Sequence, residues 1–388
     1  MSKPLRICYF GTYRANYTRN QILINGLRAQ DNIILYTCHA TLWHSIADRV
    51  EQASGGWRHP RFWWRVIRTY LQLIRNYTQI PDYDIMLIGY PGQFDAYLGR
   101  LLTWLNRKPM ALDILMSLHL VAEERGLTQK SPFTGKLLFT LEKIGLHLPD
   151  HLIAENQEYQ DYIATKYNLP ANRFSRLPHG VNDQMYAPRP HITPPADEFR
   201  LVYHGTFLPS HGLPTILGAA HQLADQPRYQ FHFYGRGPGR DDALAYAQEH
   251  NLTNLTFHGW VSDDELLDGL ASAHIILGIF GTTRQSLMTV QNKIWEGLAM
   301  GRPMISGDAA TIREFLTPDE HIHLIPRQDP AALAHAIQTL DQNPNPREAM
   351  AQREAMAQRA QAYVLQHHSI PGLGRHLAQL LAHHTPPT

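Results

Sequence analysis

The sequence predicts an α/β protein of two domains, each built on a parallel, Rossmann-like sheet. The chain has 388 residues, which suits two such domains better than one. Short apolar runs alternate with amphipathic helical stretches through both halves, as they do in repeated βαβ units. A polar stretch with four prolines, between Ala187 and Glu198, interrupts this alternation and indicates a linker.

The domain boundaries follow from these observations. We expect a first domain at residues 1–187, a linker at 188–198 and a second domain at 199–360. Residues 361–388 are expected to form a C-terminal helix that packs back on the first domain. Strands are expected at residues 5–10, 32–38, 85–88, 110–115 and 151–154 in the first half, and at 200–203, 230–234, 255–258, 275–279, 304–306 and 322–325 in the second.

The composition excludes several classes of protein. Hydrophobic residues make up 44% of the chain and charged residues 18%, which excludes extensive disorder, and the net charge of +1 gives no general attraction for nucleic acid. Only two cysteines, Cys8 and Cys38, are present, so a disulfide framework is excluded and a reducing, cytoplasmic compartment is favoured. We see no signal peptide and no apolar stretch of about 18 residues that could cross a membrane. The 23 histidines are scattered, so no metal site is predicted.

Residues 57–77 differ from the rest of the chain. They contain five arginines and three tryptophans but no acidic residue. Helical spacing places Trp64, Ile67, Leu71 and Ile74 on one apolar face, with the arginines beside it. A helix of this kind suits the headgroup region of an anionic bilayer. An ordinary domain helix whose arginines reach solvent explains the same face equally well, so both interpretations stay open.

Three loops that follow predicted strands contain glycine. They begin at Gly11, Gly205 and Gly235, and the last continues to Gly239. Glycine after a strand lets a ligand approach the backbone, and the N-terminus of the next helix offers N–H groups to an anion. Because no G-x-G-x-x-G motif is present, a dinucleotide site is not favoured.

A helix is predicted to start near Asn292 and to end at Gly301, which takes the place of a C-terminal glycine. Lys293 and Glu296 are three residues apart and therefore share one face of it. A lysine in the first turn can meet a diphosphate, and a carboxylate one turn later can accept two ribose hydroxyls. On spacing alone, a structural Lys–Glu pair is the simpler explanation. Another helix is expected to begin at Ser262, with a capping box completed by Glu265.

In combination, several segments resemble the second domain of the retaining, GT-B-type glycosyltransferases of family 4 (glycosyl transferases group 1). These segments follow the family's order and spacing, and they are residues 177–182, 205–212, 234–237, 258–261 and 293–303. The resemblance covers about residues 150–345 and is looser in the first domain, where it rests on Gly11 and strand order. It implies the GT-B fold, with two facing Rossmann-like domains and a deep interdomain cleft. It also implies a nucleotide-sugar donor held mainly by the second domain.

The resemblance implies roles for individual residues. Glu296 matches the second glutamate of the family's Glu-x7-Glu motif, which is expected on the ribose, and Lys293 is expected at the diphosphate. Gly11 and Thr12 match the glycine loop that faces the donor phosphates, and Arg236 is expected near the nucleobase. The remaining donor-binding candidates are Gly205, Thr206, His211, Gly235 and Val261.

The chain departs from the family pattern at three positions. Met288 occupies the place of the first glutamate, and Thr206 and His211 occupy the places of the donor-phosphate arginine and lysine. Either Lys293, with help from a protonated His211, neutralises the diphosphate, or activity is weak or absent. A partly charged His211 would make donor binding sensitive to pH.

The catalytic candidates are His119, Asp113 and Lys293. Members of the family often carry a histidine after a first-domain strand, over the donor sugar, and His119 lies a few residues beyond that place. Asp113, near the end of the same strand, is the other candidate for it. Lys293 would stabilise the negative charge that develops on the leaving phosphate.

These residues predict a retaining, metal-independent hexosyltransferase. It would move a sugar from a nucleoside-diphosphate sugar to an acceptor hydroxyl in the synthesis of a cell-surface glycan or polysaccharide, with no cofactor beyond this co-substrate. The expected partners are the donor, a glycan or lipid-linked acceptor and an anionic membrane surface at residues 57–77. The expected location is the cytoplasm, peripheral to the inner face of the cell membrane. Two alternatives remain, a non-catalytic nucleotide- or glycan-binding scaffold and a nucleotide-sugar epimerase on the same fold.

Overall fold

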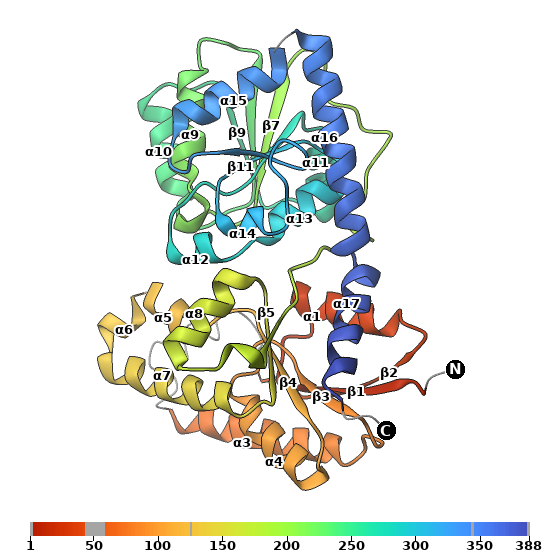
Figure 1. The fold of residues 1–388 in the computed structure, drawn as a ribbon. Helices are drawn as coiled ribbons and strands as arrows, with labels where there is room; N and C mark the ends of the chain where they lie inside the picture. The colour runs from red at the N-terminus through yellow and green to blue at the C-terminus, as the bar shows by residue number, and fades with distance from the viewer. Residues whose placement is uncertain (1–2, 43–58, 125, 343–344, 386–388) are drawn as a thin grey trace. The chain divides into compact units, whose positions relative to one another are not determined.

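The computed structural model describes residues 3–42, 59–124, 126–342 and 345–385, which belong to two compact units (Figure 1). The first unit contains the chain up to Pro178 together with the segment from Ile370 onward, and the second contains His179–Ser369. Each unit is built on a parallel six-stranded sheet, with helices on both faces. The predicted α/β class with two Rossmann-like sheets is therefore confirmed.

The sheet of the first unit has the strand order β2-β1-β3-β4-β5-β6. Its strands are β1 (Leu5–Gly11), β2 (Ile33–His39), β3 (Ile85–Ile88), β4 (Met110–Ile114), β5 (His151–Ala154) and β6 (Phe174–Arg176). Its helices are α1 (Thr18–Arg28), α3 (Pro60–Tyr77), α4 (Asp95–Asn106), α5 (Leu118–Glu124), α6 (Leu127–Lys130), α7 (Pro132–His147), α8 (Gln157–Tyr167), the 3₁₀ turn η2 (Ala171–Arg173) and α17 (Ile370–His383).

Strand β1 contributes buried side chains to both faces of the first sheet. Ile7 and Tyr9 belong to a buried cluster that also includes Leu23 of α1 and Leu373 of α17. Phe10 points to the opposite face, where its ring packs edge-on against Tyr77 of α3. Because successive side chains of a strand point to opposite faces, a continuous apolar run is what a sheet covered by helices on both sides requires.

The sheet of the second unit has the order β12-β11-β10-β7-β8-β9. Its strands are β7 (Phe199–His204), β8 (Tyr229–Tyr234), β9 (Leu255–Gly259), β10 (Ile275–Leu277), β11 (Met304–Gly307) and β12 (His323–Ile325). Its helices are the 3₁₀ turn η3 (Pro209–His211), α9 (Leu213–Gln222), α10 (Arg240–Glu249), α11 (Asp263–Ala271), α12 (Arg284–Met288), α13 (Asn292–Ala299), α14 (Ala310–Arg313), α15 (Pro330–Gln342) and α16 (Pro346–His367).

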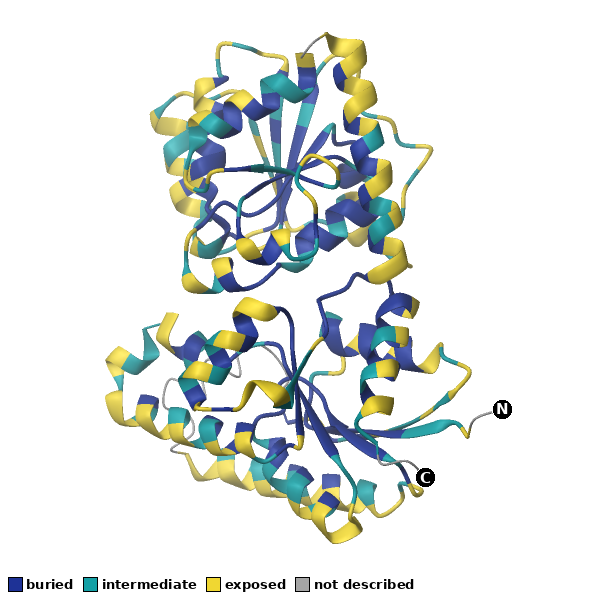
Figure 2. Cartoon of the chain, in the orientation of Figure 1, coloured by how far each residue is buried: buried dark blue, intermediate teal, exposed yellow. Residues whose placement is uncertain are grey.

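The central strands of the second sheet are buried (Figure 2). The side chains of β7 are divided between two cores: Leu201 and Tyr203 lie in a cluster with residues of α9 and α15, whereas Val202 lies in a cluster with residues of α11, α13 and α16. The two ends of α13 are therefore fixed by packing of its buried side chains, including the fully buried Trp295.

The predicted strands are all present, with ends shifted by one or two residues. Strand β6 was not predicted, because its three residues form a partly exposed edge strand without an apolar run. The capping box of Ser262 and Glu265 is confirmed. Gly301 follows α13 with a φ of 68°, as expected for a glycine that ends a helix.

The units divide at other positions than expected. The chain passes from the first unit to the second between Pro178 and His179, whereas the proline-rich residues 188–198 lie on the second unit. Val181 is buried in the second unit's core, and Arg302 donates to the carbonyl of Ile192 at 3.2 Å. Helix α16 also stays with the second unit to its end, so only α17 returns to the first unit. The proline-rich segment is thus a surface segment of the second unit and is not where the chain passes from one unit to the other.

The longest helix in the described chain is α16, with 22 residues, and it is rich in charged and amide side chains. Among the described residues, no helix combines the length and the apolar character needed to cross a membrane.

The contact between α1 and α17 depends on a pair of glycines. A methyl group on Gly26 would overlap the carbonyl oxygen of Ile370 and the backbone of Gly374. Gly26→Ala should therefore lower the free energy of unfolding of the first unit by about 1–3 kcal/mol, because backbone atoms must shift. Urea denaturation measures this loss. Asn25→Ala, on the exposed side of α1, is the control and should change stability by less than about 0.5 kcal/mol. Equal effects of the two changes would contradict the close approach.

Candidate functional site

The carboxyl edge of the second sheet is open at two glycines. Gly205 follows β7 with a φ of 122°, and Gly235 follows β8 with a φ of 120°. Both angles disfavour residues with a Cβ atom. The Gly205 amide donates to the Tyr234 carbonyl at 2.9 Å, and a Cβ on Gly235 would overlap the Gly205 carbonyl. The two loops therefore lie backbone to backbone at this edge.

Helix α13 begins at the same edge and carries the predicted Lys293. The Gln291 side chain makes no capping hydrogen bond, so the first N–H groups of the helix have no side-chain partner at that position. Lys293 is 5% exposed, and its Nζ lies 3.1 Å from the point where a Cβ on Gly205 would stand. Lys293 is also the only lysine between His179 and Ser369. The second unit thus places its single ammonium group against the glycine loop.

Two neighbours hold the Lys293 side chain. Its Nζ lies 3.8 Å from the centroid of the Tyr203 ring and 3.3 Å from Nδ1 of His211. The Tyr203 hydroxyl lies 2.6 Å from the same Nδ1 atom of His211. Tyr203 and His211 therefore both contact the end of the Lys293 side chain. Burial lowers the pKa of Lys293 well below its ordinary value, and nearby Glu296 opposes this shift.

The expectation of a protonated His211 is wrong. Burial, together with the charges of the neighbouring Lys293 and His204, lowers its pKa to about 2. His211 is therefore neutral across the physiological range and contributes no charge to a diphosphate. The pH dependence expected from His211 must come from Lys293, which the sequence could not indicate because it depends on how deeply each side chain is buried.

Glu296 lies one turn after Lys293 and is held by His204. The His204 Nε2 lies 3.0 Å from Oε2 of Glu296. Burial raises the pKa of Tyr186, and the charge of the same Glu296 carboxylate adds to the rise. Within the described chain, Nδ1 of His204 is buried without a hydrogen-bond partner. Neither His204 nor Tyr186 was singled out from the sequence. The one feature of the sequence that could have indicated His204 is its position at the end of a predicted strand, directly before the loop that begins at Gly205.

The other donor candidates of the second unit surround this edge. Thr206 is exposed, and its carbonyl accepts from Leu208 at 2.8 Å. The Arg236 guanidinium lies 3.1 Å from the point where a Cβ on Gly259 would stand. Val261 is half-buried and packs against the core that contains α13. Met288 is buried at the end of α12, so its side chain belongs to the packed interior.

In the first unit, the Gly11–Thr12 loop is occupied by a side chain. The Thr12 amide donates to Oδ2 of Asp95 at 2.7 Å, and the Tyr70 hydroxyl donates to Oδ1 at 2.8 Å. Burial raises the pKa of Asp95 to about 6, whereas these hydrogen bonds oppose the rise. The expectation that the Thr12 amide faces a donor phosphate is therefore corrected, because a carboxylate from α4 already takes it.

Asp113 forms a buried ion pair. Its two oxygens accept from Nε and Nη2 of Arg19, both at 2.7 Å, and both residues are about 1% exposed. Arg19 also donates to the carbonyls of Leu177 and Pro178, where the chain leaves the first unit. A role for Asp113 at a reacting sugar would require this ion pair to break.

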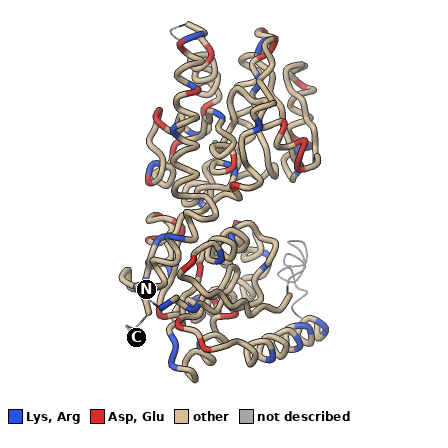
Figure 3. The backbone as a smooth tube through the Cα atoms, turned by 90° about the vertical axis from the view of Figure 1, so that its right-hand side faces the viewer, with Lys and Arg blue, Asp and Glu red and all other residues tan. Residues whose placement is uncertain are grey.

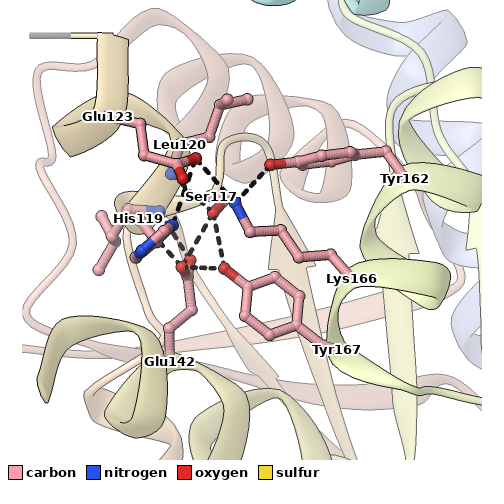
Figure 4. Close-up of polar contacts among 9 residues, drawn as sticks. Ser117, His119, Leu120, Glu123, Glu142, Tyr162, Lys166 and Tyr167 are labelled. Carbon is pink, nitrogen blue, oxygen red and sulfur yellow. Dashed lines mark hydrogen bonds and ion pairs between the residues drawn. The ribbon is translucent and has the colours of Figure 1, made fainter. Parts of the chain in front are cut away.

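His119 lies in α5, whose first turn is held by the buried carboxylate of Glu142 (Figure 4). Glu142 accepts from the amides of Leu118 and His119, at 2.6 and 2.9 Å. The hydroxyls of Ser117 and Tyr167 donate to the same carboxylate, at 2.9 and 2.5 Å. This network fixes the start of α5 at the carboxyl end of β4, so His119 has a rigid backbone.

The imidazole of His119 lies over α7. Its Nδ1 is 3.4 Å from Glu123, and its ring packs edge-on against Phe139. Burial and the charge of Lys166 lower the pKa of His119, although Glu123 and Glu142 oppose the shift. The ring also lines a surface cavity of about 480 Å³, together with Thr128, Pro132, Gly135, Lys136, Phe139 and Thr140. A neutral histidine at a cavity can accept or donate a hydrogen bond to a ligand.

Among the residues that the structure describes, no three histidine, cysteine, aspartate or glutamate side chains gather as a metal site would require. The prediction that the protein has no metal site remains a prediction.

Part of the chain is similar in sequence to a known protein family and to one characterised relative. Residues 198–343 match the family described as Glycosyl transferases group 1. Over 272 residues, the chain is 25% identical to the O-antigen chain mannosyltransferase C of Escherichia coli. The matched region covers 68% of this chain and 67% of that protein.

Solved structures resemble nearly the whole chain. The complex of Anabaena HepE with UDP has a TM-score of 0.67 at 15% identity and covers 98% of this chain and 100% of that one. The sucrose-phosphate synthase of Thermosynechococcus elongatus has a TM-score of 0.69 at 16% identity and covers 98% and 99%. At such identities the likeness shows the fold, which is the GT-B fold.

The ion pair of Arg19 and Asp113 has a testable consequence. Asp113→Asn should lower the unfolding free energy by about 3–5 kcal/mol, because it leaves a buried guanidinium without its counter-charge. Asp82→Asn is the matched control, since Asp82 pairs with Arg6 and Lys108 at a side chain that is 62% exposed, and should cost less than about 1 kcal/mol. Urea denaturation measures both. A stable Asp113→Asn protein with lost enzymatic activity would instead place Asp113 at the reaction.

Proposed function

We propose a specific reaction for this chain, which is a glycosyltransferase with the GT-B fold. It moves a hexose from a nucleoside-diphosphate sugar to an acceptor hydroxyl, with retention of configuration and without a metal ion. The acceptor oxygen forms a bond to the anomeric carbon, and the bond from that carbon to the phosphate oxygen breaks. The acceptor proton leaves with the departing diphosphate or passes to water.

The observation that carries this proposal is the placement of Lys293 and Glu296. A buried ammonium group at a glycine loop, beside the uncapped start of α13, is arranged to meet a diphosphate. Glu296 stands one turn farther along the same helix, with its carboxylate oriented by His204, where it can accept two ribose hydroxyls. The UDP and UDP-glucose complexes of the structurally similar Anabaena HepE support a donor of this chemical class.

Lys293 has the main catalytic role in this proposal. Charge that develops on the leaving phosphate is stabilised by a cation already fixed between Tyr203 and His211, so little reorganisation is required during the reaction. His211 contributes a neutral acceptor that orients Lys293. His119 remains the first-unit candidate for a hydrogen bond to the donor sugar.

We further propose that the acceptor is a cell-surface glycan or its lipid-linked precursor, which the similarity to an O-antigen mannosyltransferase supports. The chain would then work in the cytoplasm at the inner face of the cell membrane. Residues 57–77 are the proposed contact with an anionic membrane. Of this segment, Trp57 and Arg58 lie outside the described residues.

Nucleotide binding tests the proposed donor site. A thermal-shift screen against UDP, GDP, ADP and CMP should find one ligand that adds about 2.7 kcal/mol of stability at a hundred times its dissociation constant. Glu296→Gln and Lys293→Met should each lose most of this stabilisation, whereas Glu249→Gln, exposed on α10, should keep it.

Turnover then separates the alternatives. Transfer of sugar to an acceptor supports the proposal. Binding without turnover would support the scaffold, and interconversion of free donor without an acceptor would support the epimerase. Binding that survives both site variants would place the donor elsewhere.

Lys293 should also couple nucleotide binding to proton uptake. Burial lowers the pKa of Lys293 in the free protein, whereas a bound diphosphate raises this pKa by favouring the ammonium form. Affinity should therefore fall as pH rises between the lowered pKa of the free protein and the higher pKa of the complex, by up to about ten-fold per pH unit.

Calorimetry in buffers of different ionisation enthalpy, above about pH 7 where the nucleotide phosphates are ionised, measures this uptake. His211→Gln should retain it, because His211 is already neutral, and Lys293→Arg should abolish it. Proton uptake that persists in Lys293→Arg would assign it to another group.

A further inference from the structure

We infer that helices α3, α4 and α7 together form one docking surface for an anionic lipid bilayer. This inference extends the membrane contact proposed for residues 57–77 to two further helices, and it does not depend on the transfer reaction. The surface lies entirely within the first unit.

The three helices are adjacent and linked by hydrogen bonds (Figure 1). Near the start of α4, the Tyr70 hydroxyl of α3 donates to Asp95, and at its end Asn106 donates to the Tyr77 hydroxyl at 3.0 Å. On the other side of α4, the Tyr97 hydroxyl donates to the carbonyl of Leu141 in α7 at 2.7 Å. The three helices therefore present a continuous outer face.

This outer face exposes large apolar side chains. On α3, the apolar stripe predicted from the sequence faces solvent, and Trp64 is 69% exposed. The side of α3 that is buried carries Thr69 and Leu73 instead. The exposed large apolar residues of the three helices are Trp63, Trp64, Ile67, Leu71 and Ile74 on α3, Leu101, Trp104 and Leu105 on α4, and Phe133, Leu137 and Ile144 on α7.

Exposure of the stripe favours the membrane interpretation of the two that the sequence left open. An ordinary domain helix would bury Trp64, Ile67 and Leu71 against its own sheet, yet each is at least half exposed. Apolar patches of this extent on a folded unit mark contact with a partner or a membrane.

The charge of the face selects an anionic partner (Figure 3). The three helices contain only two acidic residues, Asp95 and Glu142, and both are buried in hydrogen-bond networks. The exposed charges are therefore all basic. On the helices themselves they include Arg61, Arg68, Arg75 and Lys136.

Exposed tryptophans among arginines suit the headgroup region of a bilayer, where aromatic rings lie at the boundary and cations meet lipid phosphates. A protein partner would have to bury these cations against its own acidic groups. A bilayer of anionic lipid supplies both the apolar layer and the negative charge at once.

Vesicle flotation of the full chain tests the inference, with phosphatidylcholine vesicles that contain or lack phosphatidylglycerol. The chain should float with the anionic vesicles only, and less so at high salt. The double variant Trp104→Glu and Leu105→Glu changes α4 alone and should bind at least about five-fold more weakly. Arg68→Glu on α3 should have a similar effect. The matched controls, Met350→Glu and Arg347→Glu on exposed positions of α16, should bind like the wild type.

Three outcomes would overturn the inference. One is a wild-type chain that does not float with anionic vesicles. A second is loss of binding in the α3 variant with full binding in the α4 variant, which would confine the contact to α3. The third is a stable dimer in solution that the α4 variant dissociates, together with no vesicle binding, which would assign the face to a second copy of the chain. Nucleotide stabilisation should be the same in all variants, so failure of this inference is distinct from failure of the proposed reaction.

Discussion

The parallel arrangement of both sheets is the constraint on which the rest of the molecule depends. In a parallel sheet all strands end at one edge, so every loop that follows a strand is gathered there. The second unit uses this edge for the glycine loops at Gly205 and Gly235 and for the start of α13. Because helices pack on both faces of the sheet, these loops start from rigid elements, and backbone hydrogen bonds also join the two loops.

Within this frame, one buried lysine lies against the glycine loop of the second unit. Members of the resembled family use an arginine and a lysine in the glycine loop, and here Thr206 and His211 stand in their places. Lys293 reaches the loop from α13 and rests on the Tyr203 ring. A side chain at position 205 would compete with Lys293 for the same space.

Much of this arrangement could be predicted from the sequence, and the remainder could not for a definite physical reason. The positions of the strands along the chain, the capping box of Ser262 and the pairing of Lys293 with Glu296 on one helix face all follow from local pattern. The occupancy of polar groups depends on residues distant in the chain. Asp95 lies 83 positions from the Thr12 amide that it binds.

Dependence on residues distant in the chain also explains why the expectations about the charge of His211 and about the domain boundaries were incorrect. The pKa of His211 depends on burial between elements, which no spacing reveals. The proline-rich segment was mistaken for the crossing point because its composition is that of any exposed loop. The apolar stripe of α3 could be predicted from helical periodicity. Its exposure to solvent, and the similar faces of α4 and α7, could be seen only in the three-dimensional structure.

The return of α17 to the first unit has a consequence for synthesis of the chain. The core of that unit includes Leu373, Leu377 and Leu381, which are synthesised only after the whole second unit. A nascent chain must therefore keep the α1 face of the first sheet uncovered while the second unit is made. Synthesis of α17, rather than completion of the first sheet, is the event that completes the core of the first unit.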